Sequence, residues 1–306
     1  MEDPTESLKQ RRSFFVMGST QLEISDEDTM DLTAYRNNEQ EKTRIADLMR
    51  MVPETVKSVI DIGARDGFLS KELTNYCPSV TALDLEMPVI DHPNVRCLKG
   101  DATALQFPDA SFDLVFCSEV LEHIPSPALE QACSELGRIA DQYVLIGVPY
   151  MQDIRHGRTT CYSCGKTNPP WAHVNSFDET RLKLLFPDFE VVRINFVGKG
   201  EPGTNNLSAY LLNLAGNPFG TYIQEEPCVH CGMRLKPPPS RNLTQKVLTR
   251  VAYTVRRAQI PFTPARGNWI HVLFRKRGVN PEKEKHAPAT CGLSAKLGLH
   301  PSRSDA

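Results

Sequence analysis

The sequence lacks several features that would assign it to a specialised class of protein. No apolar run approaches the roughly 18 residues that a membrane-spanning helix needs. Neither sign of charge dominates, because 35 lysines and arginines nearly balance 37 aspartates and glutamates. The net charge of −2 therefore gives no global bias toward polyanions. The first residues contain no basic leader followed by an apolar stretch, so we expect no signal peptide and a cytoplasmic location.

The cysteines do not suit a disulfide framework. There are nine, an odd number, in a chain without a secretory signal. Four of them form two C-x-x-C pairs, which are considered below. Four others lie in apolar or helical patterns and are interpreted as small buried hydrophobic residues. These are Cys77, Cys97, Cys117 and Cys133.

Short apolar runs alternate with helical segments through most of the chain. Strands separated by helices imply an α/β fold with a parallel sheet and right-handed crossovers. Ser176 followed by Glu179 fits a capping box at the start of one helix. Strands are predicted at 57–63, 80–86, 95–98, 112–120, 143–150, 189–198 and 268–277, and helices at 31–51, 68–77, 127–140, 176–186 and 241–258.

Two irregular segments divide this pattern and suggest the domain organisation. The first is polar and rich in proline, and the second is rich in glycine and proline. We expect a core with two insertions between polar termini. The expected parts are a flexible arm at 1–30, a core at 31–199 with an insertion at 151–172, a second insertion at 200–265, a last core strand at 266–277, and a disordered tail at 278–306.

A glycine-rich turn follows the first predicted strand and opens a helix. Such a turn lets a ligand approach the backbone and meet the helix N-terminus, although it could also be an ordinary tight turn. Asp84 closes the second strand, 21 residues after Gly63, where a carboxylate suits the two hydroxyls of a ribose. Asp101, before the fourth strand, suits an adenine amino group or is simply a turn residue. A nicotinamide dehydrogenase would need G-x-G-x-x-G, but Arg65 and Phe68 replace the second and third glycines.

Four stretches of the chain together resemble class I S-adenosylmethionine (SAM)-dependent methyltransferases of the type 11 kind. The third is the most specific, because a D-A-x-x-L-x-F-P-D-x-S-F-D-L-V run is followed by L-E-H-I. The resemblance covers about 40–200 and the last strand. It implies a Rossmann-like, seven-stranded, mostly parallel sheet with helices on both faces, and SAM as the cofactor. The stretches are 59–67, 81–86, 100–125 and 143–150.

The resemblance also implies where the methionine part of SAM would lie. Asp61, Gly63 and Gly67 would cradle the methionine part. Ser118 and Glu119, at the end of the fourth strand, would border its methyl group.

The adenosine part would lie along the next two strands. Asp84 would hold the ribose with Leu85 beside the adenine, while Asp101 and Ala102 would touch the adenine ring. The chain departs from the family at Arg65, where glycine is usual. A side chain at this position fits the turn if its φ is negative.

The two C-x-x-C-G pairs predict a structural zinc site. Each pair can bind one ion from a tight turn that the glycine relieves, and two pairs supply four thiolates. Two unrelated pairs of thiols or a redox pair are the alternatives. Because 63 residues separate the pairs, each must lie in its own inserted segment outside the sheet, here called an excursion. We expect zinc to join the two excursions into a cap at the carboxyl edge of the sheet, where the parallel strands end. The four ligands are Cys161, Cys164, Cys228 and Cys231, with His156, His173 and His230 as spare candidates.

No side chain identifies itself as a catalytic base. Methyl transfer mainly requires that the acceptor is held in line and that water is excluded. His123, Tyr150 and His156 are candidates because they follow strands near the cofactor. His123 could equally support its own loop.

A basic segment extends from 241 to 277, with nine arginines and lysines and no acidic residue. A solvated helix face explains it, and so does a peripheral contact with an anionic membrane. No recognised RNA-binding motif supports nucleic acid as the partner. The preferred function is methyl transfer to a small molecule or glycan. The alternatives are a nucleic-acid or protein methyltransferase, or a non-catalytic SAM-fold module.

Overall fold

A computed structural model describes residues 36, 38–200, 203–224, 226–263 and 266–278. The predicted arm at 1–30 and the predicted tail, apart from Gly278, lie outside these residues, as does Cys291. Within the described part of the chain, no helix is long and apolar enough to cross a membrane.

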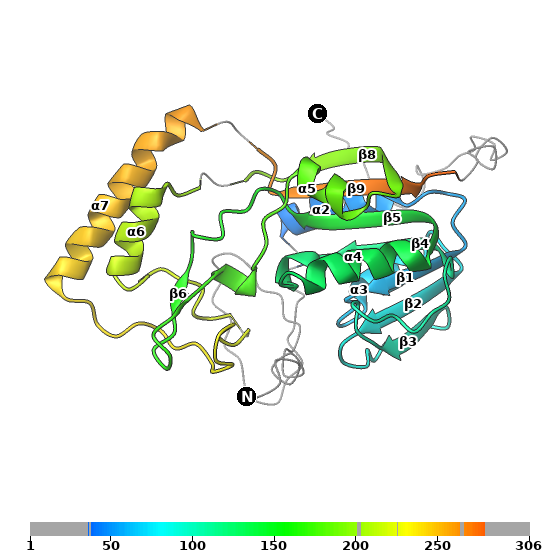
Figure 1. The fold of residues 1–306 in the computed structure, drawn as a ribbon, viewed down its shortest axis with the longest axis horizontal. Coiled ribbons are helices and arrows are strands. Elements are labelled where there is room, and N and C mark those ends of the chain that lie inside the picture. Colours follow the sequence, from blue (N-terminus) through cyan, green and yellow to red (C-terminus); the bar gives the residue numbers. More distant parts are fainter. Residues whose placement is uncertain (1–35, 37, 201–202, 225, 264–265, 279–306) are drawn as a thin grey trace, which may run out of the picture.

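Seven strands form one twisted sheet, as the sequence predicted (Figure 1). Five pair in parallel because each is followed by a crossover that returns the chain to the same edge. Only β9 is reversed, and it lies between β5 and β8. The order is β3 (Val95–Lys99), β2 (Ser79–Asp84), β1 (Ser58–Ile62), β4 (Phe112–Ser118), β5 (Ala140–Pro149), β9 (Trp269–Lys276) and β8 (Phe189–Val197).

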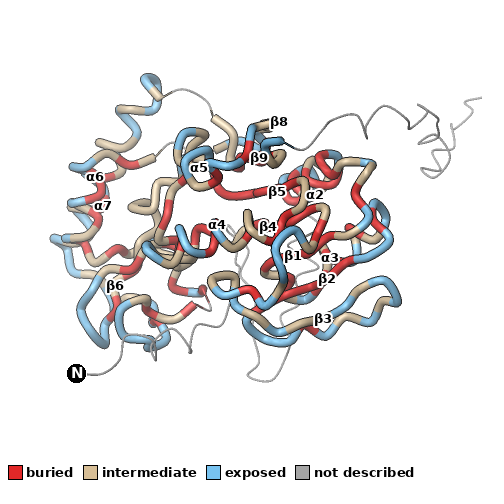
Figure 2. Tube along the Cα trace, turned by 45° about the vertical axis from the view of Figure 1, so that its right-hand side comes forward, coloured by how far each residue is buried: buried red, intermediate tan, exposed pale blue. Residues whose placement is uncertain are grey.

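Helices cover both faces of this sheet, and alternate residues of the central strands supply the two cores. α4 (Ala128–Ile139) shows the sequence basis, since its apolar residues recur at helical spacing and are buried under the sheet. α5 (Glu179–Leu185) lies on the same face of the sheet as α4, while α2 (Glu39–Met51) and α3 (Phe68–Leu73) lie on the opposite face. Burial is greatest in the central strands and falls toward β3 at the edge (Figure 2).

Two long excursions leave the sheet at one edge. Pro149 at the end of β5 and Val197 at the end of β8 both pair with Trp269, the first residue of β9. The excursions, 150–178 and 198–268, therefore start and finish side by side. Together they build a lobe beside the sheet, here called the cap, which contains the cysteine pairs (Figure 1). Its elements are β6 (Thr159–Thr160), β7 (Thr167–Asn168), the 3-10 helices η2 (Pro170–Ala172) and η3 (Ile260–Phe262), α6 (Asn206–Leu214) and α7 (Leu243–Gln259).

Three local expectations differ from the structure. α5 begins after Asp178, whose side chain accepts a hydrogen bond from the Arg181 amide, so Ser176 is not its cap. α6 occupies part of a segment expected to be irregular, and Asn205 starts it with a capping box. Cys97 is half-buried because β3 is the edge strand, whereas the other three cysteines expected in the core are buried.

α7 exposes apolar side chains. Its apolar row at 243, 247 and 251 faces outward, and only Thr249 and Ala252 are buried. α7 therefore leaves an apolar stripe on the surface of the cap.

Candidate active site and cysteine cluster

The turn between β1 and α3 is shaped by two glycines. Gly63 and Gly67 have φ values of 79° and 76°, in the left-handed region that glycine adopts without strain. The Gly63 and Ala64 amides both donate to the Leu83 carbonyl, which holds the turn against β2. A Cβ on Gly63 would lie 2.3 Å from the side chain of Val120. The turn therefore packs its backbone against the loop after β4.

Arg65 adopts a conformation that the sequence did not predict. Its φ is 51°, so the condition of a negative φ, under which a side chain would fit the turn, is not met. A non-glycine residue in this region is strained, and such strain gathers at functional sites. The Arg65 amide donates to the Asp84 carboxylate at 2.9 Å, which compensates part of the cost. Asp84 is thus tied to the glycine turn and lies beside it.

Two other carboxylates predicted to bind SAM, at the carboxyl edge of the sheet, differ in exposure. Asp61 is buried and accepts a hydrogen bond from the Ser70 hydroxyl at 2.6 Å, so it faces the start of α3. Burial raises the pKa of Asp61 to about 7, with Asp84 and Asp66 adding to the rise. Asp101 is exposed and accepts from both the amide and the hydroxyl of Thr103.

Leu85 and Ala102 border the same edge of the sheet. Leu85 directly follows β2 and is 41% exposed, while Ala102 packs partly against the core. The Gly100 amide donates to the Asp84 carbonyl at 2.8 Å, which holds the segment after β3 next to the end of β2. The predicted adenosine-binding residues are therefore neighbours along this edge.

Ser118 ends β4 next to α2, and Glu119 follows it. The Ser118 hydroxyl accepts from Arg44, which also forms a buried ion pair with Glu41. Glu119 has a φ of 57° and accepts a hydrogen bond from the Trp269 indole at 3.3 Å. Burial raises the pKa of Glu119 to about 7 against the opposing effect of Arg44. The sequence did not single out Arg44 or Trp269, because no local motif marks residues so distant in the chain.

The three catalytic candidates have different surroundings. The His123 ring meets the His173 ring edge to face at 4.6 Å, and burial lowers the pKa of His123 to about 4. The Tyr150 hydroxyl donates to the Glu179 carboxylate at 3.2 Å. His156 lies in the first excursion of the cap, where its amide donates to the Asp153 carbonyl.

The four predicted cysteines converge in the cap. Their sulfur atoms all lie within 4.8 Å of one another, although the pairs come from different excursions. The Cys161–Cys231 and Cys164–Cys228 sulfur distances are both 3.7 Å. The two turns are built alike, since the amides of Gly165 and Gly232 each donate to the carbonyl of the first cysteine in their pair.

These distances fit a tetrahedral zinc ion. Zinc–sulfur bonds of 2.3 Å place sulfurs about 3.8 Å apart. Four thiolates at such separations repel one another without a cation between them. Among the described histidines, none joins this cluster: the His230 ring donates to the Thr167 carbonyl, and His173 groups with Glu122 and His123. The donors and their spacing fit zinc.

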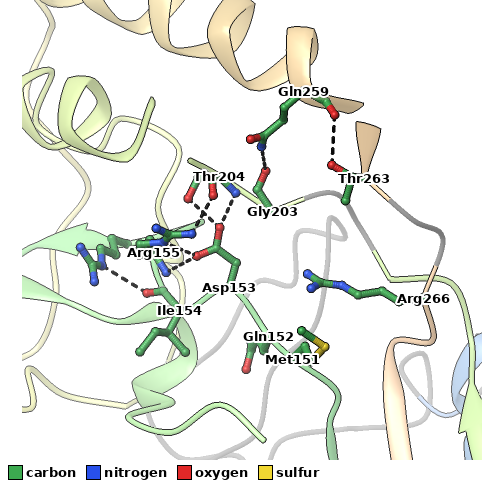
Figure 3. A pocket seen from close by; sticks show the side chains of 11 residues that line it. Met151, Gln152, Asp153, Ile154, Arg155, Gly203, Thr204, Gln259, Thr263 and Arg266 are labelled. Carbon is green, nitrogen blue, oxygen red and sulfur yellow. Dashed lines mark hydrogen bonds and ion pairs between the residues drawn. The ribbon is translucent and has the colours of Figure 1, made fainter. Parts of the chain in front are cut away.

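A cavity of about 510 Å³ lies where the two excursions meet (Figure 3). Its charged lining consists of Asp153 and three arginines. Although burial opposes it, hydrogen bonds from Arg155 and Thr204 lower the pKa of Asp153. Arg155 also donates to the Thr204 carbonyl at 2.7 Å and so joins the excursions. The remaining arginines, Arg158 and Arg266, leave the lining with an excess of positive charge.

Parts of this chain are similar to known methyltransferases. A family described as a methyltransferase domain matches residues 60–142. An uncharacterized methyltransferase of Mycobacterium bovis is 29% identical over 138 residues, which are 40% of this chain and 69% of that protein. A ubiquinone biosynthesis O-methyltransferase of Stutzerimonas stutzeri is 36% identical over 95 residues, 26% of this chain and 39% of that protein. The N-methyltransferase NodS of Bradyrhizobium japonicum, solved with S-adenosyl-L-homocysteine, has a TM-score of 0.45 at 14% identity, covering 80% of this chain and 91% of that one.

The strand order and the matched domain define a class I SAM-dependent methyltransferase. Residues 60–142 match the methyltransferase-domain family, and the inserted cap contains a four-cysteine cluster.

Proposed function

We propose that this enzyme methylates a small-molecule or glycan acceptor that carries an anionic group. The arginine-rich cavity between the excursions supports this proposal, because it lies at the carboxyl edge where ligands of open α/β sheets bind. Arginine is suited to carboxylates and phosphates, since its planar fork can donate two parallel hydrogen bonds.

We further propose that the core, 31–199 with 266–277, holds SAM along this edge. When bound, SAM supplies the methyl group. One Asp84 oxygen would accept from the ribose while the carboxylate keeps its hydrogen bond to the Arg65 amide. The turn at Gly63 and Gly67 would admit the methionine part, with Ser118 and Glu119 beside it. The adenine would contact Leu85, Asp101 and Ala102.

The cap would position the acceptor and exclude water. Both excursions contribute to the cavity, Met151–Arg155 from the first and Gly203 and Thr204 from the second. Zinc at the cysteine cluster would keep the two excursions together, since its ligands come from both. In this proposal zinc is structural, because four thiolates fill its coordination and leave no open position.

The outer face of α7 supports a peripheral contact with an anionic membrane. Leu243, Val247 and Val251 are 78%, 49% and 45% exposed. Lys246 and Arg250 are exposed beside them, and this helix carries no acidic residue. An apolar stripe with basic neighbours is typical of helices that lie in a membrane interface.

The acceptor class can be tested with labelled product. The protein is incubated with methyl-tritiated SAM and the small-molecule fraction of a cell extract, and labelled compounds are separated by anion exchange. We expect the label in a fraction that the exchanger retains. In Arg158→Gln, the rate of methyl transfer at limiting acceptor should fall at least about tenfold, because one charge-assisted hydrogen bond to the acceptor is lost.

Arg193→Gln, on the exposed side of β8, is the matched control and should leave transfer unchanged. S-adenosylhomocysteine affinity should stay the same in both variants. Label found only in unretained fractions, or equal transfer by Arg158→Gln and wild type, would contradict an anionic acceptor.

A further inference from the structure

A second group of metal-binding side chains lies at the end of β4, apart from the cysteine cluster. Glu122 and His123 belong to the 3-10 helix η1 (Leu121–His123), and His173 follows η2. One ligand atom from each lies within 4.8 Å of the others. One carboxylate and two imidazoles suit divalent transition metals such as zinc, cobalt, manganese and iron.

The backbone holds these residues in place from both sides. The Val174 and Asn175 amides donate to the Glu122 carbonyl at 2.8 and 3.2 Å. The Asn175 side chain donates to the carbonyls of Leu121 and Ile124 at 3.0 and 2.6 Å. Four hydrogen bonds thus join the segment of His173 to η1. The arrangement of the three side chains is therefore built before any ligand binds.

Glu122 is the least expected member of this group. Its side chain is fully buried, and neither carboxylate oxygen has a hydrogen-bond partner within the described part of the chain. A buried polar group without a partner costs about 1–3 kcal/mol, and a charged one costs more. A cation between the carboxylate and the two rings would provide the missing partner.

The hydrogen bonding of His173 leaves one ring nitrogen able to bind a metal. Its Nδ1 lies 2.5 Å from the Gln152 side-chain oxygen. Because this oxygen can only accept, Nδ1 carries the proton and Nε2 keeps a lone pair. Metal-binding histidines usually have such a partner on the second nitrogen.

Strain next to the group also marks it as functional. Trp171 and Ala172, which precede His173, have φ values of 56° and 55°. Consecutive non-glycine residues in this region persist only where their surroundings impose it. His123 is only half-buried, so the group is open on one side.

We propose that Glu122, His123 and His173 bind one divalent transition-metal ion. The exposed side at His123 leaves coordination positions for water or for an oxygen of the acceptor. Gln152 contacts His173 and also lines the arginine-rich cavity. An ion here would therefore lie beside the acceptor, a consequence that rests on the proposed function. The metal site itself does not depend on it.

Cobalt titration of the zinc-containing full-length protein tests the site. We expect one equivalent of Co²⁺ to bind with visible d–d absorption and without the thiolate charge-transfer band that a cysteine site would give. Zinc content measured in parallel should not change. Glu122→Gln and His173→Asn should each weaken Co²⁺ binding at least about 100-fold, while Gln152→Ala should weaken it about tenfold.

His156→Asn is the matched control, since this histidine lies outside the group, and it should bind Co²⁺ like wild type. S-adenosylhomocysteine affinity of each variant reports that the core is folded and tests the proposed function separately. The metal site is refuted if wild type binds no Co²⁺ up to millimolar concentration. It is also refuted if His173→Asn and Glu122→Gln bind Co²⁺ as wild type does.

Discussion

In the sheet core, apolar side chains from seven strands and the helices on both faces form two continuous clusters, whereas in the cap the cluster is small. The cap cluster consists of Cys161, Cys228, Tyr222 and Leu235, and half of its members belong to the cysteine site. Figure 2 shows the same contrast, with buried strands in the core and mainly exposed and intermediate backbone along α7. The core thus gains its stability from apolar burial, which the cap has little of.

Hydrogen bonds join the two excursions of the cap, and the proposed zinc ion at the cysteine cluster would join them as well. Arg155 bonds to Thr204 and Asn206, and the Thr160 amide donates to the Tyr222 hydroxyl. Small units with little apolar core commonly depend on a metal or disulfide. The comparison therefore teaches that two parts of one chain reach their folded state by different means, and each should respond to its own perturbation.

The largest expected effect is the separate loosening of the cap when the cysteine cluster is broken. In Cys231→Ser, we expect zinc content to fall from one ion per chain to less than about a tenth. Amide exchange in the cap should accelerate at least about 100-fold, because metal-binding free energy is folding free energy in such sites. Exchange in β1, β4 and β5 should remain as in wild type. Hydrogen-exchange mass spectrometry with metal analysis measures both.

Cys97→Ser is the matched control, because this half-buried cysteine lies on β3, away from the cluster. It should keep its zinc and its cap protection. If amide exchange in Cys231→Ser accelerated equally in the core and the cap, the two regions would unfold as one unit and would not be stabilised separately.

The core was predictable because its signals are local. Apolar runs of strand length predicted all seven strands, and the glycines of the first turn predicted where it bends. The features that the sequence did not predict are local details for which more than one residue or backbone conformation was available. Asp178 rather than Ser176 caps α5, and Arg65 takes a positive φ that Asp84 helps to hold. α6 was missed because it lies within a glycine- and proline-rich segment.

The site was predictable where short motifs mark it, and not where distant segments meet. The cysteine pairs carry their own spacing, so their convergence across 63 intervening residues could be anticipated. His123 and His173 were noted singly, but their approach to Glu122 depends on the path of the cap. Arg44 reaches Ser118 from a helix 74 residues away, and no local pattern indicates such a contact.

The next largest effect belongs to the core alone. Asp84→Asn should weaken S-adenosylhomocysteine binding about 10–100-fold in calorimetry, because it removes a charged acceptor worth about 1.5–3 kcal/mol. Asp101→Asn, exposed and already bonded to Thr103, should weaken it about threefold or less. Exchange in the cap should not change in either variant. Unaltered affinity in Asp84→Asn would remove Asp84 from the cofactor site.

A smaller effect should appear in the pH dependence of core stability. The pKa of Asp61 is raised to about 7 from 3.8, so the folded state binds more protons than the unfolded state between these values. The contribution of Asp61 to the free energy of unfolding is fully present below pH 3.8 and is lost as the pH rises through about 7. Its slope is at most about 1.4 kcal/mol per pH unit.

Asp61→Asn should remove this slope, since the amide does not titrate and can still accept from Ser70. Urea unfolding of both proteins between pH 5 and about 8 gives the difference. Parallel curves for wild type and variant would show that Asp61 titrates normally in the folded core.

The smallest effect concerns the outer face of the cap. Arg250→Gln should weaken binding to vesicles of phosphatidylcholine with phosphatidylserine about fivefold, because one basic side chain near an anionic surface contributes about 1 kcal/mol. Arg275→Gln is the matched control, since Arg275 lies on β9 and pairs with Glu190. Cosedimentation at low and high salt measures the affinity, which should fall with salt. If neutral and anionic vesicles bind wild type equally, the basic side chains of α7 form only a solvated helix face. The cap then differs from the core only in how it is stabilised.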